Sequence, residues 1–203
     1  MGIPSASLTT IAIRKESTLA GSGTDTTASL RVTAESIVPA VSTIASEEID
    51  ATRNVSDLNK VSSQAEGDIE FEFSPDGPID ALITSVLQAT GSGANDVDNM
   101  TDNTTYFNGT TQTSYAIEKK TSDGSTNFFQ LYQGMVPNTL ELTAESGSFV
   151  TGTVGFVGSK INAMSGSATL TSSLTTTTQP FSTVHADTNI KFNTGAASIT
   201  NGD

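Results

Sequence analysis

The sequence predicts a mainly β fold with a single strong helix. Among its 203 residues are 33 Thr and 26 Ser, and Thr favours strands and turns because its β-branched side chain is stiff. Apolar residues recur in blocks with a period of two, and only one block has a clear helical period. The apolar content of 35% is enough for the core of one mid-sized domain. We therefore expect one β domain rather than a helical bundle or a disordered chain.

The first quarter of the chain contains one predicted strand between two irregular segments. Residues 1–29 are small and polar and are expected to form an extended arm, with a frayed terminus as the alternative. Residues 30–45 are expected to form a strand in which Pro39 marks a break or an edge position. Residues 46–60 carry no period and suit a long hairpin loop. The strand is predicted from the alternation of Leu30, Val32 and Ala34 with Arg31, Thr33 and Glu35.

The clearest strand and the helix follow in turn. Between Asp68 and Phe73 acidic and apolar residues alternate strictly, which predicts one wet and one buried face. The turn Asp76-Gly77-Pro78 leads into a helix over about residues 78–90, which Gly91 would close. Its apolar stripe consists of Ile79, Leu82, Ile83, Val86 and Leu87.

Strands return after a polar loop at residues 91–111. Tyr115–Lys119 and Phe128–Tyr132 are predicted to pair through the turn Ser122–Ser125. Thr139–Glu145 and Phe149–Val157 form a second predicted pair, and the second of these strands has few charges to block pairing at a sheet edge. Residues 162–180 are Ser/Thr-rich, and Val184–Phe192 is a weak strand pattern.

Charge and composition exclude several classes of protein. The net charge of −13, from 9 Lys+Arg and 22 Asp+Glu, argues against a protein that grips nucleic acid, because binding phosphates requires Lys and Arg. It does not exclude a protein that nucleic acid slides past. The absence of Cys rules out disulfides and thiolate metal sites. No apolar run is long enough to span a bilayer, and Met1–Ser17 lacks the pattern of a signal peptide.

An ordered series of short segments resembles the phage tail tube protein family. In the first half the resemblance lies in four segments and in the helix after Asp76-Gly77-Pro78. The segments are Leu30–Ser36, Glu47–Ile49, Val55–Leu58 and Glu66–Ile69. In the second half it continues through Tyr115–Lys119, Phe129, Tyr132–Asn138, Leu140–Leu142 and Gly147–Gly158. The resemblance covers about residues 14–160. The Ser/Thr tract and the short C-terminal end depart from it, which leaves two interpretations open: a fragment of a longer chain, or a tail that a neighbouring chain completes.

The resemblance implies a β-sandwich with one flanking helix, in which strands from six subunits join an inner β-barrel. It divides the chain into an arm at 1–29, a tail tube domain at 30–160 with the long loop 46–60, and a C-terminal segment at 161–203. Stacked rings would form the conduit for genome ejection in the virion tail. The protein itself would be made in the cytoplasm of the bacterial host. The implied partners are further copies, a tape measure protein in the lumen, tail terminator and distal tail proteins at the ends, and viral DNA in transit without specific binding.

Carboxylates on the polar strand faces fit this role. If those faces line a channel, they repel phosphates, and DNA passes without Lys or Arg to hold it. The alternative is that they are ordinary solvated faces of a soluble sandwich. The candidate lumen-facing residues are Glu35, Asp68, Glu70, Glu72, Glu141 and Glu145.

Signals for catalysis, cofactors or metals are poor, so no enzyme, cofactor or metal site is expected. His185 is the single histidine and has no nucleophile motif beside it. The cluster Asn95, Asp96, Asp98, Asn99 and Asp102 offers oxygen ligands for Ca²⁺, but a solvated loop is the better interpretation because the EF-hand spacing is absent. A secreted or surface adhesin that binds glycans is the alternative function, which the absence of Trp disfavours.

Overall fold

Thr-rich, alternating segments form strands through most of the protein. The computed structural model describes residues 5–23, 26–45, 58–74, 77–89, 108–171 and 179–182. Its elements are β1 (Ser5–Lys15), β2 (Thr27–Leu30), β3 (Ala34–Glu35), β4 (Val38–Ala45), β5 (Leu58–Glu72), α1 (Gly77–Val86), β6 (Tyr115–Ser122), β7 (Asn127–Thr143), β8 (Thr151–Gly158) and β9 (Lys160–Ile161). The expected fold class, mainly β with one flanking helix, is confirmed.

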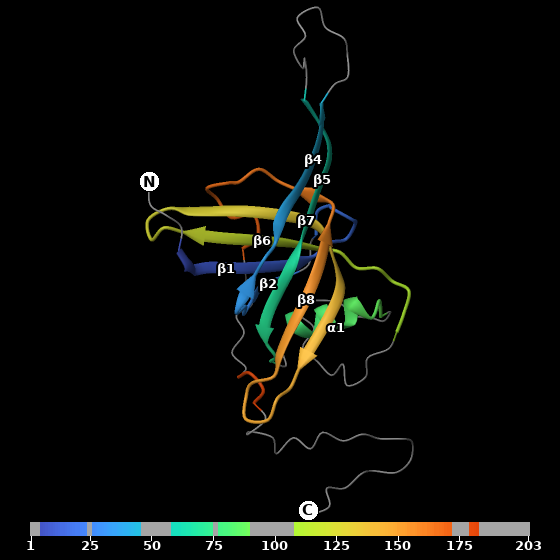
Figure 1. Cartoon of the computed structure of the whole chain (residues 1–203), viewed down its shortest axis with the longest axis vertical. Coiled ribbons are helices and arrows are strands. Elements are labelled where there is room, and N and C mark those ends of the chain that lie inside the picture. Colours follow the sequence, from blue (N-terminus) through green and yellow to red (C-terminus); the bar gives the residue numbers. More distant parts are fainter. Residues whose placement is uncertain are drawn as a thin grey trace, which may run out of the picture.

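The strands form one continuous antiparallel sheet that curls into two parts. Sheet A has the order β2-β1-β6-β7, and sheet B continues from β7 through β8 to β5, whose outer edge pairs with β3 and β4. The long strand β7 belongs to both, because its first half pairs with β6 and its second half with β8. In Figure 1 the strands of sheet A run across those of sheet B, and β7 turns from one direction into the other.

A buried carboxylate holds the bend in β7. The ladder with β6 shifts register beside Gly134, whose φ of +66° suits a residue without a Cβ. Glu16, only 5% exposed, accepts hydrogen bonds from the Gly134 N–H at 3.1 Å, the Ala20 N–H at 3.0 Å and the Ser114 hydroxyl at 2.8 Å. One side chain thereby ties the end of β1 to the approach to β6 and to the corner between the sheets.

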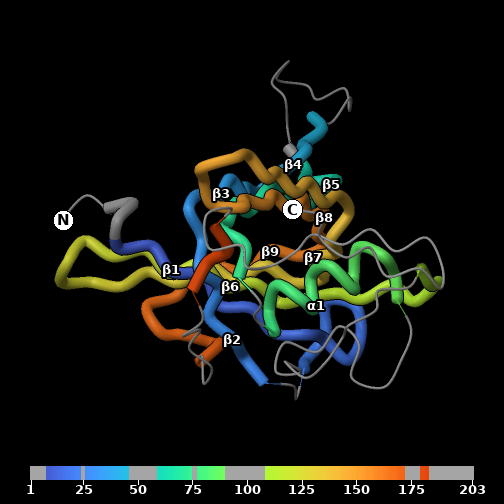
Figure 2. Tube along the Cα trace, turned by 90° about the horizontal axis from the view of Figure 1, so that it is seen from below, coloured from blue at the N-terminus to red at the C-terminus, as the bar shows by residue number. Residues whose placement is uncertain are grey.

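The core lies between the two sheets and is closed by α1. Ile11 and Ile13 from sheet A face Ile69 and Val154 from sheet B, and all four are 0% exposed. The helix adds the predicted stripe residues Ile79, Leu82 and Ile83 to the same cluster. Figure 2 shows α1 lying alongside β7, with which it makes its main contact.

The expectation of an extended arm at residues 1–29 is wrong for the described part. Ser5–Lys15 forms β1, which pairs on both edges, and Thr27–Leu30 forms β2. Residues 30–45 are not one strand, because β2 ends at Leu30 and the chain resumes in β3 and β4. Pro39 lies in β4, whose outer edge is unpaired among the described residues, and the edge placement is therefore confirmed.

The other strand and helix boundaries differ from those predicted from the sequence. β4 and β5 form the predicted hairpin, but residues 58–60 belong to β5, and 46–57 lie outside the described residues. The strands predicted at 128–132 and 139–145 are one strand, β7. β8 is not an edge strand, since it pairs with both β5 and β7. The helix ends at Val86, and Gly91 lies outside the described part, as does the weak strand at 184–192.

The Ser/Thr-rich C-terminal segment packs against the outer side of sheet A over its first described stretch. The Glu118 carboxylate, 3% exposed, accepts hydrogen bonds from the Thr169 and Leu170 N–H groups at 2.7 and 3.1 Å. Leu170 is itself buried against Ala116 and Leu131. This stretch of low-complexity composition therefore packs at a specific position on the domain.

Candidate functional site

Sheet B has one carboxylate-rich face, which we call the acidic face. The register pairs Glu70 of β5 with Thr153 of β8, and Thr153 with Glu141 of β7, so these three side chains project from the same side. The pattern repeats above and below this row. The acidic face comprises Glu66, Asp68, Glu70 and Glu72 of β5, Thr151, Thr153, Gly155 and Val157 of β8, and Thr139, Glu141 and Thr143 of β7.

The two faces of sheet B have opposite environments. Asp68, Glu70 and Glu141 are exposed and Glu72 is half-buried. On the reverse face Ile69 and Phe71 are 0% and 1% exposed. The reverse face must stay inside the core, so the orientation of the acidic face is fixed by hydrophobic burial rather than by its charges. None of the residues that make up this face is Lys or Arg.

Glu35 does not belong with the other candidates. It pairs with Ile69 in the β3–β5 ladder, so its side chain projects toward the reverse side of sheet B. There it forms a salt bridge with Lys119 of β6, and its side chain is 14% exposed. Glu35 thus links sheet B to sheet A. Glu145 lies beyond β7 in an exposed turn, where its carbonyl accepts a hydrogen bond from the Ser148 N–H at 3.2 Å.

Tyr132 lies close to this ion pair. Its hydroxyl donates a weak hydrogen bond to the Ile37 carbonyl at 3.4 Å. Burial, and secondarily the negative charge of Glu35, raises the pKa of Tyr132 above its ordinary value of 10.0. The phenol is therefore held neutral in the folded protein at a pH where an unfolded chain would ionise it.

This shift predicts an alkaline loss of stability that depends on Tyr132. Full stability is present below about pH 10 and falls as the pH rises toward and through the folded-state pKa, because only the unfolded chain then releases the proton readily. We expect Tyr132→Phe to lose less unfolding free energy than the parent between about pH 8 and about pH 11, measured by urea denaturation. An equal alkaline loss in both proteins would contradict the assignment.

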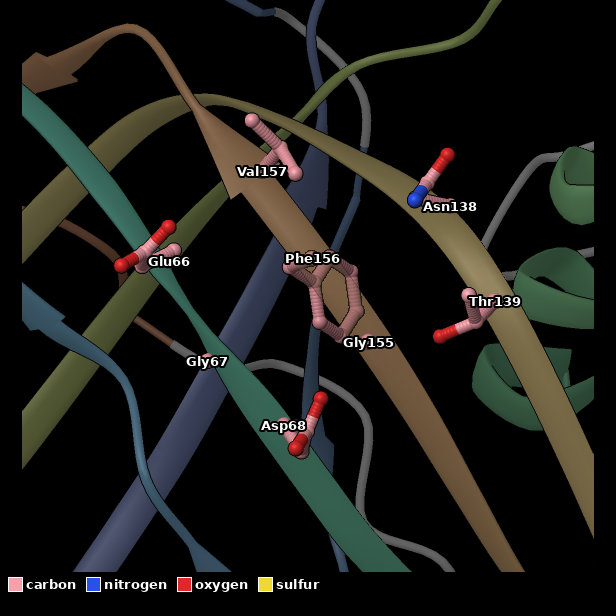
Figure 3. A pocket seen from close by; sticks show the side chains of 8 residues that line it. All are labelled: Glu66, Gly67, Asp68, Asn138, Thr139, Gly155, Phe156 and Val157. Carbon is pink, nitrogen blue, oxygen red and sulfur yellow. The ribbon is translucent and has the colours of Figure 1, made fainter.

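A hollow opens on the acidic face and is lined by residues of β5, β7 and β8. The cavity, of about 310 Å³, is lined by Glu66, Gly67, Asp68, Asn138, Thr139, Gly155, Phe156 and Val157. Figure 3 shows Asp68 and Thr139 on either side of Gly155. Glu66 is not among the candidate residues predicted from the sequence, although it continues the same alternation two residues before Asp68.

Exposed apolar side chains gather on the hairpin of β4 and β5. Val38, Val41, Ile44 and Val61 are 51–60% exposed. The hairpin extends beyond the rest of the sheet (Figure 1). At the opposite end, where β7 finishes and β8 begins, Leu142 and Phe149 are 48% and 49% exposed.

The edges of sheet B are open within the described part of the chain. No described strand pairs with the outer edge of β4, or with residues 138–143 of β7 on the side away from β8. Open edges carry unpaired backbone donors and acceptors, which favour pairing with another strand. The alternation of Leu140 and Leu142 with Glu141 and Thr143 predicts that Leu142 is buried, and this prediction is wrong, because Leu142 lies at this edge and is 48% exposed.

Features of other functional classes are sparse in the described residues. Those residues contain no grouping of three or more His, Asp or Glu suited to a metal ion, and no helix of the length and hydropathy needed to cross a membrane. His185 and the polar cluster Asn95–Asp102 lie outside the described residues.

Comparisons with known proteins give one family and several structures. The family model described as phage tail tube protein matches residues 6–203. No curated protein matches the chain. Among solved structures, the tube-terminating cap of the anti-feeding prophage is similar at 11% identity and a TM-score of 0.47, covering 82% of this chain and 93% of that one. The tail of an empty GTA particle, refined with C6 symmetry, is similar at 11% identity and a TM-score of 0.41, covering 81% of this chain and 98% of that one. An extracellular contractile injection system, the PVC sheath–tube complex in its extended state, is similar at 10% identity and a TM-score of 0.41, covering 81% of this chain and 93% of that one.

Proposed function

The chain belongs to the phage tail tube protein family, and from that premise we propose that six copies close into a ring whose lumen is lined by the acidic face. Such rings would stack into the tail tube through which the genome leaves. The observation that carries the proposal is the two-sided character of sheet B. Its reverse face is committed to the core, and the residues of the acidic face include carboxylates and hydroxyls but no Lys or Arg.

An acidic lumen suits a conduit for DNA. Phosphates bind where Lys and Arg displace their counterions, and a wall of carboxylates offers no such site. Each carboxylate would be repeated by the ring symmetry, so that DNA meets like charge on every side. The hydroxyls of Thr139, Thr151 and Thr153 keep the wall wet between the charges.

Ring closure would use the open edges of sheet B. The outer edge of β4 in one subunit would pair with residues 138–143 of β7 in the next, which continues the sheet around the ring. A closed barrel leaves no edge exposed, which removes the main hazard of an open sheet. This pairing also keeps every acidic face on the same side of the barrel wall.

Stacking would use the hairpin. Its exposed Val and Ile side chains project from one end of the subunit, and Leu142 and Phe149 offer apolar surface at the other. A contact between two different ends repeats indefinitely and produces a filament rather than a closed dimer. We also propose that the loop at 46–60 contacts neighbouring copies, because long loops in compact domains usually have a function and this one has no periodic apolar pattern of its own.

We expect the double substitution Val41→Thr and Ile44→Thr to abolish long tubes while leaving the subunit folded. Both side chains are exposed, so their replacement removes little from the core, and Thr keeps the strand propensity. Electron microscopy would count and measure tubes, and thermal denaturation would report stability. Met164→Thr is the matched control, since Met164 is 62% exposed but lies off the hairpin. Tubes of normal length from the double variant would refute hairpin stacking.

Cysteine labelling tests the function itself, because the chain has no Cys of its own. Negative-stain microscopy of purified protein should show rings or hollow tubes. In those tubes, Glu70→Cys should react with a small maleimide but not with a maleimide carrying a polymer too wide for the lumen. Ser167→Cys, exposed on the segment that covers sheet A, should react with both reagents. Glu70→Cys reacting equally with both would place the acidic face outside the lumen and overturn the proposal.

The remaining partners follow from this role. The protein is a component of the virion tail, with a structural task. We further propose production in the bacterial host cytoplasm, a tape measure protein inside the lumen, and terminator and distal tail proteins at the tube ends. The adhesin alternative has no support from the family match, which covers residues 6–203.

A further inference from the structure

The hollow on the acidic face combines two kinds of surface. Glu66 and Asp68 of β5 border it with carboxylates, and Asn138 and Thr139 of β7 border it with an amide and a hydroxyl. Val157 of β8 adds an apolar wall and is 48% exposed. The combination distinguishes the hollow from the rest of the acidic face, where carboxylates alternate with Thr alone.

Gly155 allows two side chains that border the hollow to approach β8 closely. A Cβ at this position would overlap Thr139 Oγ1 and lie 2.9 Å from Asp68 Oδ1, so these two side chains lean over the bare backbone from either flank. Figure 3 shows this arrangement, with Glu66 and Val157 farther along the same strands. Any larger residue at 155 would displace these two side chains and change the shape of the hollow.

The lining fits a long cationic side chain. A lysine has an apolar methylene stem and a charged tip, and such side chains bury the stem on apolar surface while the tip reaches polar partners. Val157 would contact the stem, and the ammonium would lie between Glu66 and Asp68 with Thr139 as a further acceptor. Among the described residues no Lys or Arg forms a salt bridge with either carboxylate. A small inorganic cation would make no use of the apolar wall.

We infer that the hollow is a docking site for a lysine side chain of a basic polypeptide that runs along the lumen. The inference rests on the proposed function, which repeats the hollow around each ring and from ring to ring. DNA is a poor occupant because its phosphates would face Glu66 and Asp68. A repeated set of weak cation sites would hold a polypeptide through multivalency while letting it leave when the tube empties.

A fluorescent oligolysine peptide tests the inference on assembled tubes, with oligoglutamate as the control peptide. We expect oligolysine to bind at low salt and the double substitution Glu66→Gln and Asp68→Asn to weaken that binding about tenfold or more. Glu70→Gln with Glu72→Gln is the matched control, since it removes the same charge from the same face outside the hollow. Its expected effect is about threefold or less, from the general field alone.

Gly155→Ala separates shape from charge. It displaces the Thr139 hydroxyl and the Asp68 carboxylate from their places at the hollow without changing any charge, and both groups belong to side chains that can rotate aside. We expect it to weaken oligolysine binding several-fold while the melting temperature and tube length stay near those of the parent. If this variant fails to fold, the two double variants with carboxamides still decide the question, because they change no glycine. These two carboxamide pairs are Glu66→Gln with Asp68→Asn and Glu70→Gln with Glu72→Gln.

Three outcomes would overturn the inference. They are equal weakening by the two carboxamide pairs, unchanged binding to a folded Gly155→Ala variant, and no oligolysine binding to tubes at all. The last outcome includes a hollow already filled by a neighbouring copy. All binding is measured on tubes seen by microscopy, so absence of tubes would count against the proposed function, whereas failure on intact tubes would count against the lysine site alone.

Discussion

Replacing Phe71 with alanine should lower the free energy of unfolding by about 3–5 kcal/mol. The ring is 1% exposed, at the centre of the cluster that joins both sheets and α1. Its edge lies over Gly152 of β8, where a Cβ would come within 2.5 Å of Phe71 Cζ. The surrounding sheet is paired on both sides and cannot collapse into the space left by the ring, so the cavity cost adds to the lost burial.

Urea denaturation of the unassembled protein would measure this loss. Phe149→Ala is the matched control, because that ring is 49% exposed and should cost about 1 kcal/mol or less. We expect the Phe71 variant to form few tubes, since the acidic face depends on the strand whose reverse side Phe71 anchors. A cost below about 1 kcal/mol for Phe71→Ala would show that the core is not organised around this ring.

Strong local patterns were sufficient to predict several elements. The alternation from Asp68 to Phe73 predicted β5, and the 3.6-residue stripe predicted α1, because each pattern reports a single face turned toward the core. The prediction from the sequence does not include β1, although Ile11 and Ile13 alternate with Ala12 and Arg14. Small polar residues on both sides obscured that short pattern, and its pairing partners lie far away in the sequence, in β2 and β6.

Long-range contacts explain the other errors. Seating of the Ser/Thr-rich segment depends on Glu118, about fifty residues earlier, which no local pattern reveals. β7 reads as two strands because Gly134 and Pro137 interrupt it, yet the Glu16 carboxylate holds the chain continuous through the bend. Leu142 has the periodicity of a core residue, but it occupies an edge that a single subunit leaves open.

The candidate site was predicted in part. Asp68, Glu70, Glu72 and Glu141 do share one face, since alternation fixes facing wherever a strand is regular. Glu35 fails for a physical reason. The alternation from Leu30 to Glu35 predicts one strand, whereas the chain leaves β2 at Leu30 and begins a new pairing at Ala34. A new register resets which side each residue faces, and it turns Glu35 toward Lys119.

Genome ejection should slow or stall in phage whose tube protein has Glu70→Lys and Glu72→Lys. Both positions lie on the acidic face beside Thr153 and Thr151, and ring symmetry would turn each new ammonium into a circle of cations around the DNA. Tubes should still assemble, because charges on a solvent-facing surface contribute little to stability. The defect should be largest at low ionic strength and should diminish as salt screens the phosphate contacts.

A DNA-binding dye whose fluorescence rises as the genome leaves the virion would time ejection. The measurement would be repeated over a series of salt concentrations. Glu70→Gln with Glu72→Gln separates the two causes, since it removes the repulsion without adding cations. We expect that variant to eject close to normally, because retention of DNA requires positive charge rather than only the loss of negative charge. An unchanged ejection rate for the lysine variant at low salt, with intact tubes, would show that DNA does not pass along the acidic face. Retention in both variants would instead assign the carboxylates an active role in keeping DNA off the wall.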